Sequence, residues 1–247
     1  MPENTRSTVV LGSVIIGVAL ILALGLHGWE LASRDSGNSI SVVGSSKRAV
    51  TADLAKWSAT ITRQATAYNL KAVLEQAATD VTKIKAFATA EGIAAETVRI
   101  SPASTNPVYE QNDKYGQSQT VSGYTVSQEV AIESKDIQKI DSLARDQGKL
   151  IDQGIVTQYQ RTEYFYSKLA DLRPELFAEA TKDAKLRALA VVQGTGAKVG
   201  SLKSAKTGVV QVSSPSSLDV SDYGNYDTST KEKEVSATVN VSFELLK

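Results

Sequence analysis

The sequence predicts an α+β fold: largely antiparallel sheet with helices packed on one face, internally duplicated and preceded by one N-terminal transmembrane helix. Three observations support this prediction. An apolar run lies near the N-terminus. Two helix-like segments have similar sequences at an offset of 102 positions, and strand-like segments follow one another without strict β-α-β alternation. After the membrane helix, the expected order is β-β-α-β-β-α-β-α-β-β.

The apolar run is "VVLGSVIIGVALILALGL", residues 9–26, which is 18 residues long. A transmembrane helix needs roughly 20 mostly apolar residues, whereas the apolar core of a signal peptide has about 7–15. We therefore expect a cytoplasmic segment at 1–7, an uncleaved transmembrane helix at 8–29 and a polar linker at 30–39. Release of a soluble protein by signal-peptide cleavage is the alternative. The slight positive bias before the helix, from Arg6 and the α-amino group, favours a cytoplasmic N-terminus and a main domain outside.

The duplicated helices are "NLKAVLEQAATDVTKIKAFATAEG" (69–92) and "DLRPELFAEATKDAKLRALAVVQG" (171–194). Asn69 and Asp171 are suitable N-caps. Pro174 is expected in the first turn, where its missing N–H costs little. Both segments end in Gly, which suits the left-handed C-cap.

Each helix shows apolar residues at intervals of three or four, so one face of each is expected to be buried. In the first helix these residues are Leu70, Leu74, Ala77, Val81, Ile84 and Ala88. In the second they are Phe177, Ala180, Ala184, Ala188 and Val191. The first helix should cover a strand face that carries Trp57 and Ile61.

The expected strands are an opening strand at 40–46 and three pairs of equivalent segments. The pairs are 54–65 with 155–167, 97–101 with 206–214, and 123–134 with 235–246. In the first pair Trp57 corresponds to Tyr159. A further helix is expected at 135–154. Because each half alone is small, we expect the two halves of the domain at 40–247 to be interwoven around one core.

Two long polar segments, 102–123 and 215–234, occupy equivalent places in the two copies. They carry four tyrosines: Tyr109, Tyr115, Tyr223 and Tyr226. Long loops are often functional, and Tyr among Ser, Asn and Gly is typical of adaptable contact surfaces. These tyrosines are therefore candidate oligomer contacts, although plain hairpin tips would have the same composition.

Composition restricts the function. Lys plus Arg and Asp plus Glu each number 27, so the basic excess typical of nucleic-acid binders is missing. The chain has no Cys and one His, which leaves little for a metal site. "GTGAKVG" (194–200) follows a helix, so it indicates a helix C-cap and turn rather than a dinucleotide loop. We expect no enzyme and predict no catalytic, cofactor-binding or metal-ligating residue.

Several segments together resemble the SIMPL domain family over roughly residues 40–247. They are "GSSKRAVTADLAKWSATI", "ISPASTNPVYE", "GYTVSQEVAI", "AEATKDAKLRALAVVQGTGAKVGSL" and "EVSATVNVSFEL". This family consists mostly of bacterial exported proteins, with some members linked to oxidative-stress defence and related proteins that form ring-like homo-oligomers. The resemblance implies a self-assembling protein of the cell envelope and supplies no catalytic residue. Combined with the apolar run, it predicts a single-pass protein of the bacterial inner membrane. The expected partners are further copies of the chain and, through residues 8–29, the lipid bilayer.

Overall fold

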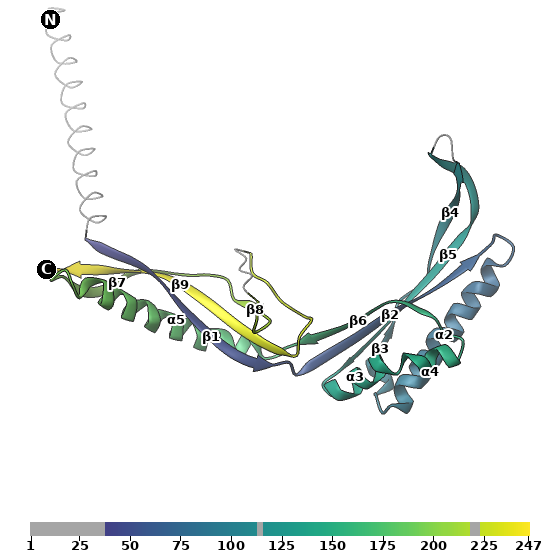
Figure 1. Cartoon of the computed structure of the whole chain (residues 1–247), viewed down its shortest axis with the longest axis horizontal. Coiled ribbons are helices and arrows are strands. Elements are labelled where there is room, and N and C mark those ends of the chain that lie inside the picture. The colour runs from purple at the N-terminus through teal and green to yellow at the C-terminus, as the bar shows by residue number, and fades with distance from the viewer. Residues whose placement is uncertain (1–37, 113–115, 218–222) are drawn as a thin grey trace, which may run out of the picture. The chain divides into compact units, whose positions relative to one another are not determined.

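The computed structural model describes residues 38–112, 116–217 and 223–247 (Figure 1). The expected cytoplasmic segment 1–7 and membrane helix 8–29 lie outside these residues, as does most of the linker. Among the described residues, no helix is both long and apolar enough to cross a membrane. The α+β class is confirmed, with two antiparallel sheets and four α-helices in this part of the chain.

The chain forms two compact units built from alternating segments. Unit 1 comprises the described part of Met1–Lys47 with Arg173–Val210 and Ser236–Lys247, and unit 2 comprises Arg48–Leu172 and Gln211–Val235. Their buried residues form separate clusters on the two sheets, whereas we expected one shared core.

Unit 2 contains a five-stranded sheet in the order β3-β5-β2-β6, with β4 also paired to β5. All four strand pairings are antiparallel. The strands are β2 (Leu54–Ala65), β3 (Val98–Ile100), β4 (Ser104–Asn112), β5 (Gly116–Ser134) and β6 (Thr157–Phe165).

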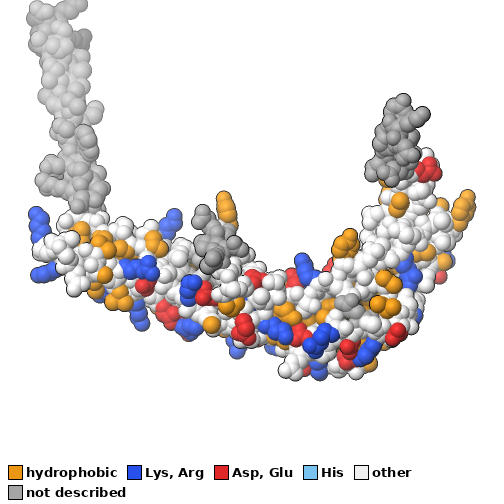
Figure 2. All heavy atoms as spheres, viewed as in Figure 1, with side chains coloured by type: hydrophobic (Ala, Val, Ile, Leu, Met, Phe, Trp, Pro, Cys, Tyr) orange, Lys and Arg blue, Asp and Glu red, His pale blue; other side chains and the backbone are white. Residues whose placement is uncertain are grey.

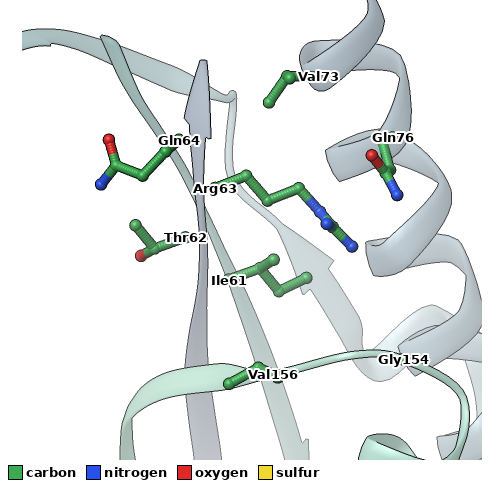
Figure 3. A pocket seen from close by; sticks show the side chains of 8 residues that line it. All are labelled: Ile61, Thr62, Arg63, Gln64, Val73, Gln76, Gly154 and Val156. Carbon is green, nitrogen blue, oxygen red and sulfur yellow. The ribbon is translucent and has the colours of Figure 1, made fainter. Parts of the chain in front are cut away.

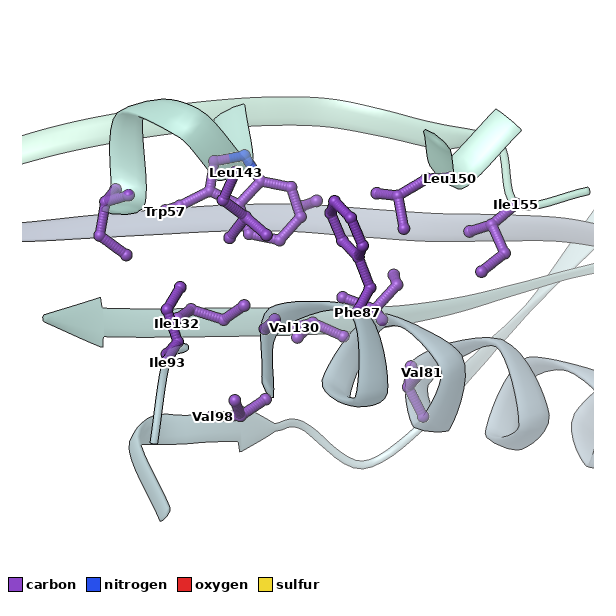
Figure 4. Close-up of a cluster of buried hydrophobic side chains, with 14 of the residues drawn as sticks. Trp57, Val81, Phe87, Ile93, Val98, Val130, Ile132, Leu143, Leu150 and Ile155 are labelled. Atoms are coloured by element: carbon purple, nitrogen blue, oxygen red, sulfur yellow. The ribbon is translucent and has the colours of Figure 1, made fainter. Parts of the chain in front are cut away.

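The helices of unit 2 cover one face of this sheet. They are α2 (Leu70–Ala90), α3 (Ile137–Arg145), α4 (Gln147–Asp152) and the short 3₁₀ helix η1 (Ala95–Thr97). Buried side chains of α2, α3 and α4 share one cluster with β2 and β5 (Figure 4). The segment expected as one helix at 135–154 is therefore two helices. The interruption lies at Asp146, and Gly148 follows shortly after it.

The predicted core of unit 2 is largely correct. Trp57 and Ile61 are buried on β2 beneath Val81 and Ile84 of α2. The first two turns of α2 differ, because Val73 is buried there while Leu70 and Leu74 are only partly buried. The buried stripe of the helix is therefore shifted by one residue at its N-terminal end.

The other sheet has the strand order β1-β9-β7, with β8 paired to β9, and unit 1 holds most of it. Its strands are β1 (Ser39–Thr51), β7 (Lys198–Thr207), β8 (Gln211–Ser213) and β9 (Glu232–Leu246), and its helix is α5 (Leu169–Val192). Small residues of α5 pack on large ones of β9: Ala180, Ala184 and Ala188 against Val239, Val241 and Phe243. The expected strand at 206–214 is in fact the end of β7 followed by β8.

The ends of α5 differ from the prediction. The helix begins at Leu169, so Pro174 is its sixth residue and lies beyond the first turn. Gly196, with φ 77°, takes the left-handed conformation that was expected of Gly194. In the last turns Val192 is buried, whereas Val191 is exposed.

The strand orders of the two sheets correspond, but not as the sequence repeat suggests. In one sheet β5 lies between β2 and the β3–β4 segment, and in the other β9 lies between β1 and β7. The counterpart of β2 is therefore β1, and β6 is an additional strand beside β2. This explains why Trp57 is buried while Tyr159 is 85% exposed, in a left-handed conformation with φ 49°, where the β2–β6 pairing shifts register.

The two expected polar loops have different structures. Most of 102–123 forms β4 and the first part of β5, so the loop expected there is a hairpin. Pro107 is compatible with β4 because an edge strand tolerates a missing N–H. In 214–231 the described residues form no named strand and only an isolated bridge from Tyr226 to Val212, so this segment remains a long connection.

Candidate functional site

The β4–β5 hairpin extends past the sheet as a two-stranded ribbon. β4 pairs with β5 from Ser104↔Ser127 to Asn112↔Gly116, whereas the pairing of β2 with β5 ends at Tyr124. Among the side chains that the structure describes in this ribbon, Val108, Tyr109 and Val121 are large, apolar and exposed. Among the described strands β4 pairs with β5 alone, so its other side offers free backbone donors and acceptors to a further strand.

Three of the four candidate tyrosines, Tyr109, Tyr223 and Tyr226, lie in the described residues. Tyr109 lies on β4 and is 45% exposed, and Tyr115 lies outside the described residues. Tyr223, on the β8–β9 connection, is 97% exposed. As contact candidates, Tyr109 and Tyr223 are accessible.

Tyr226 has a structural role inside unit 2. Its hydroxyl accepts a hydrogen bond of 2.8 Å from the backbone N–H of Tyr166, and its ring lies 6.0 Å from the ring of Phe165. The β8–β9 connection is thereby fastened to the end of β6. Tyr226 is nevertheless 37% exposed, so its role as a contact between copies stays a prediction.

Lys233 lies buried beneath this fastened connection. Its ammonium donates to the carbonyl oxygen of Asp227 and lies 5.9 Å from the centre of the Tyr226 ring. Burial lowers the pKa of Lys233, and the charge of Asp227 opposes that shift. Burial alone would raise the pKa of Asp227, but hydrogen bonds from Ser229 and the charge of Lys233 outweigh it, so the pKa is lowered. Because the lysine is enclosed, this pair holds the connection in place and offers no accessible nucleophile.

A second polar cluster joins α3, β6 and the segment before β9. The Tyr164 hydroxyl donates to Asp141 at 2.7 Å, and Lys231 contacts the other oxygen of that carboxylate. Burial, together with the hydrogen bond to Asp141, raises the pKa of Tyr164 to about 12. Burial opposes ionisation of Asp141 as well, but its bonds to Lys231 and Tyr164 prevail and lower its pKa. Neither group can exchange a proton readily near neutral pH, so the cluster is suited to fastening elements together and unsuited to acid–base catalysis.

An open cleft of about 320 Å³ lies between β2, the start of α2 and the segment before β6 (Figure 3). Its lining combines apolar side chains with one cation: Ile61, Thr62, Arg63, Gln64, Val73, Gln76, Gly154 and Val156. Arg63 donates from Nε to Oδ2 of Asp80 at 2.6 Å, and its Nη2 lies 2.5 Å from the same oxygen. The Asp80 side chain is buried, whereas about a quarter of the Arg63 side chain is exposed.

The sequence contains a signal for this ion pair, although neither Arg63 nor Asp80 was predicted as a site residue. Arg63 continues the alternating buried face of β2 that holds Trp57 and Ile61, and Asp80 interrupts the apolar stripe of α2. Two opposite charges on facing apolar surfaces predict a partly buried pair, because an unpaired charge there would be too costly.

The described surface otherwise carries mixed charge and no metal cluster. Figure 2 shows acidic and basic side chains interspersed on the visible face. Within residues 38–112, 116–217 and 223–247, no group of three or more His, Cys, Asp and Glu side chains could hold a metal ion.

The described residues form an α+β protein with two antiparallel sheets, one covered by the helices α2, α3 and α4 and the other by the single helix α5. The family follows from comparison with known families, because the model of SIMPL, a protein of unknown function (DUF541), matches residues 40–243. The match spans most of the chain, so the chain belongs to the SIMPL family. Comparison with curated proteins gives no match.

Proposed function

We propose that this chain is a single-pass protein of the bacterial inner membrane whose SIMPL domain lies in the periplasm and assembles with further copies of itself. Residues 8–29 would hold it in the lipid bilayer, with the N-terminus in the cytoplasm. Its role would be structural or protective of the envelope, including against oxidative stress, and would require no catalysis. The stress-related part rests on the family resemblance.

The exposed β4–β5 ribbon is the observation that supports self-assembly. Two-stranded ribbons are marginal alone in water, and exposed apolar side chains on one are unfavourable unless a partner covers them. Val108, Tyr109 and Val121 would be buried by a neighbouring copy, and the open side of β4 could add backbone hydrogen bonds. Strand β1 offers a second edge, because it pairs with β9 alone among the described strands, whereas β9 is central.

A soluble periplasmic binding module, released by signal-peptide cleavage, is the alternative, and the cleft beside Arg63 is the observation that favours it. The intact mass of the protein purified from its own membrane or periplasm separates the two. A mass that lacks the first thirty-odd residues would rule out the anchor.

The proposed topology predicts accessibility from the periplasmic side. Protease added to intact spheroplasts should digest residues 40–247 and leave a short N-terminal fragment in the membrane. The physical reason is the bias of positive charge before the apolar segment, which disfavours export of the N-terminus. Complete protection in spheroplasts, with digestion only after lysis, would contradict this orientation.

If the ribbon forms the contact between copies of the chain, substitutions on it should weaken self-association. Tyr109 and Val121 are cross-strand partners, and both are exposed in one chain. Replacing both with Ser should weaken self-association at least about tenfold while changing the free energy of unfolding by less than about 1 kcal/mol. The mass of the assembly, followed by light scattering on dilution, measures the effect.

The matched control replaces Leu186 and Leu189, exposed apolar residues of α5, with Ser. It removes a similar apolar area and should leave self-association unchanged. If both double variants weakened association equally, the ribbon would not be the contact. Deleting residues 219–231 would be an unsuitable test, because it removes Tyr226, Asp227 and Lys231, which hold unit 2 together.

A further inference from the structure

We infer that the cleft beside Arg63 binds a small carboxylate with a short apolar body. The cleft lies wholly within unit 2, and its residues come from β2, from α2 and from the segment between α4 and β6. Its volume of about 320 Å³ is at the lower end of the range of pockets for small ligands, roughly 300–1,000 Å³. This inference extends beyond self-assembly and does not depend on it.

The first argument is the position of Arg63. On the helix-covered face of a sheet, a charged residue contributes less to the free energy of folding than an apolar residue of similar size, because it loses its hydration. A partly buried ion pair at this place therefore adds little stability. Arg63 lies where the core would otherwise continue, between Ile61 of the larger cluster and Ala65 of the smaller one. Stability alone therefore does not account for a cation at this place.

The second argument is the orientation of the guanidinium. Asp80 engages Nε and Nη2 through one oxygen, Oδ2, and so fixes the plane of the group. Within the described part of the chain Nη1 has no hydrogen-bond acceptor, and Arg63 lines the open cleft (Figure 3). A guanidinium fixed in this way presents its remaining donors with little further loss of side-chain entropy, which is the arrangement that carboxylate recognition uses.

The third argument is the rest of the lining. Gln76 is one turn before Asp80 on α2, and its amide can donate a further hydrogen bond to an anion held by Arg63. Ile61, Val73 and Val156 supply apolar walls. Because Asp80 already neutralises Arg63, the cleft has no surplus positive charge. It therefore favours a singly charged group with an apolar body over phosphate or another multiply charged ion.

Hexanoate is the probe that tests the site, titrated into the full-length chain in detergent and measured by calorimetry. Hexanol and hexylammonium have the same number of carbon atoms as hexanoate but no carboxylate. Inorganic phosphate is an anion without an apolar chain, and detergent alone is the blank. We expect one hexanoate per chain with a dissociation constant on the order of 1 mM, as suits so few heavy atoms. The other three probes should bind at least about tenfold more weakly.

A pair of substitutions locates the binding. Val156→Asp puts a carboxylate at the exposed rim of the cleft and should weaken hexanoate binding at least about tenfold by charge repulsion. Ile151→Asp makes the same change at an exposed residue outside the cleft and should leave binding unchanged. Both side chains are exposed in the native fold, so circular dichroism should show both variants folded.

Three results would overturn the inference. Hexanol binding as tightly as hexanoate would mean that Arg63 takes no part, and equal weakening by both substitutions would place the ligand elsewhere. No binding of hexanoate up to about 20 mM, well above the expected constant, would mean that the cleft has no such ligand. None of these results bears on self-assembly, so failure here leaves the proposed function standing.

Discussion

Replacing Gly44 with Ala is expected to destabilise unit 1 severely. A Cβ at this position of β1 would lie 2.0 Å from the carbonyl oxygen of Ala180 and 2.6 Å from the backbone nitrogen of Ala184. Both atoms belong to the backbone of α5, which cannot move aside as a flexible side chain could. Strand and helix would have to separate, and overpacking of this kind costs about 1–3 kcal/mol, occasionally more.

Separation of β1 from α5 would also strain a polar connection between them. Asp183 accepts a hydrogen bond of 2.7 Å from the backbone N–H of Ser45, and Arg187 binds the same carboxylate at 2.8 Å. We therefore expect Gly44→Ala to cost about 3 kcal/mol or more, which lowers the melting temperature by roughly 10 °C in a chain of this size. Thermal unfolding followed by circular dichroism measures the effect.

Gly194→Ala is the control for that substitution. Gly194 is also in unit 1, and a Cβ there would meet no atom within 4 Å. Its φ is not positive, so Ala fits the backbone and should change stability little or raise it slightly. Equal melting temperatures for Gly44→Ala and Gly194→Ala would show that α5 does not lie against β1 as described.

Replacing Ile84 with Ala is the second change with a large expected effect. Ile84 is fully buried between α2 and the sheet of unit 2, so truncation leaves a cavity and should cost about 2–5 kcal/mol. Leu74→Ala makes a similar truncation on the same helix at a partly buried position. Because solvent already reaches Leu74, its loss should cost about half as much or less.

The comparison of Ile84→Ala with Leu74→Ala tests the orientation of α2. The sequence alone predicts equal effects, because both residues lie on its apolar stripe. Denaturant unfolding at equilibrium measures both free energies. A larger loss for Leu74→Ala would contradict the packing of the helix.

The sequence predicts those features that depend on local patterns. β2 is predicted with its true bounds, and α2 within one or two residues at each end, because alternation and 3–4 spacing are strong there. Gly92 takes the left-handed conformation, with φ 78°, as a glycine after a helix often does. The buried positions Trp57, Val81 and Ile84 follow from the same periodicities.

Features that depend on distant partners are not predictable in this way. The β4 segment is polar and contains Pro107, so it resembles a loop until its pairing with β5 is known. Tyr159 matches Trp57 in the repeat but lies on the additional strand β6, where a register shift turns it outward. Gly44 resembles any strand glycine until α5 is placed against it.

The candidate site shows the same limit. Tyr109, Tyr223 and Tyr226 are all exposed to some extent, but composition could not predict that the hydroxyl of Tyr226 is bound to the backbone of Tyr166. Arg63 and Asp80 are 17 positions apart in the chain, and their pairing depends on how α2 lies across β2.

The oligomeric state of residues 40–247 without the membrane segment is the most direct measurement of whether the SIMPL domain itself assembles. Light scattering coupled to size exclusion at micromolar concentration gives the mass of the particle. We expect a mass several times that of one chain, because the ribbon and the open edge of β4 belong to this domain. A monomer under these conditions, with the fold intact by circular dichroism, would contradict assembly through the domain.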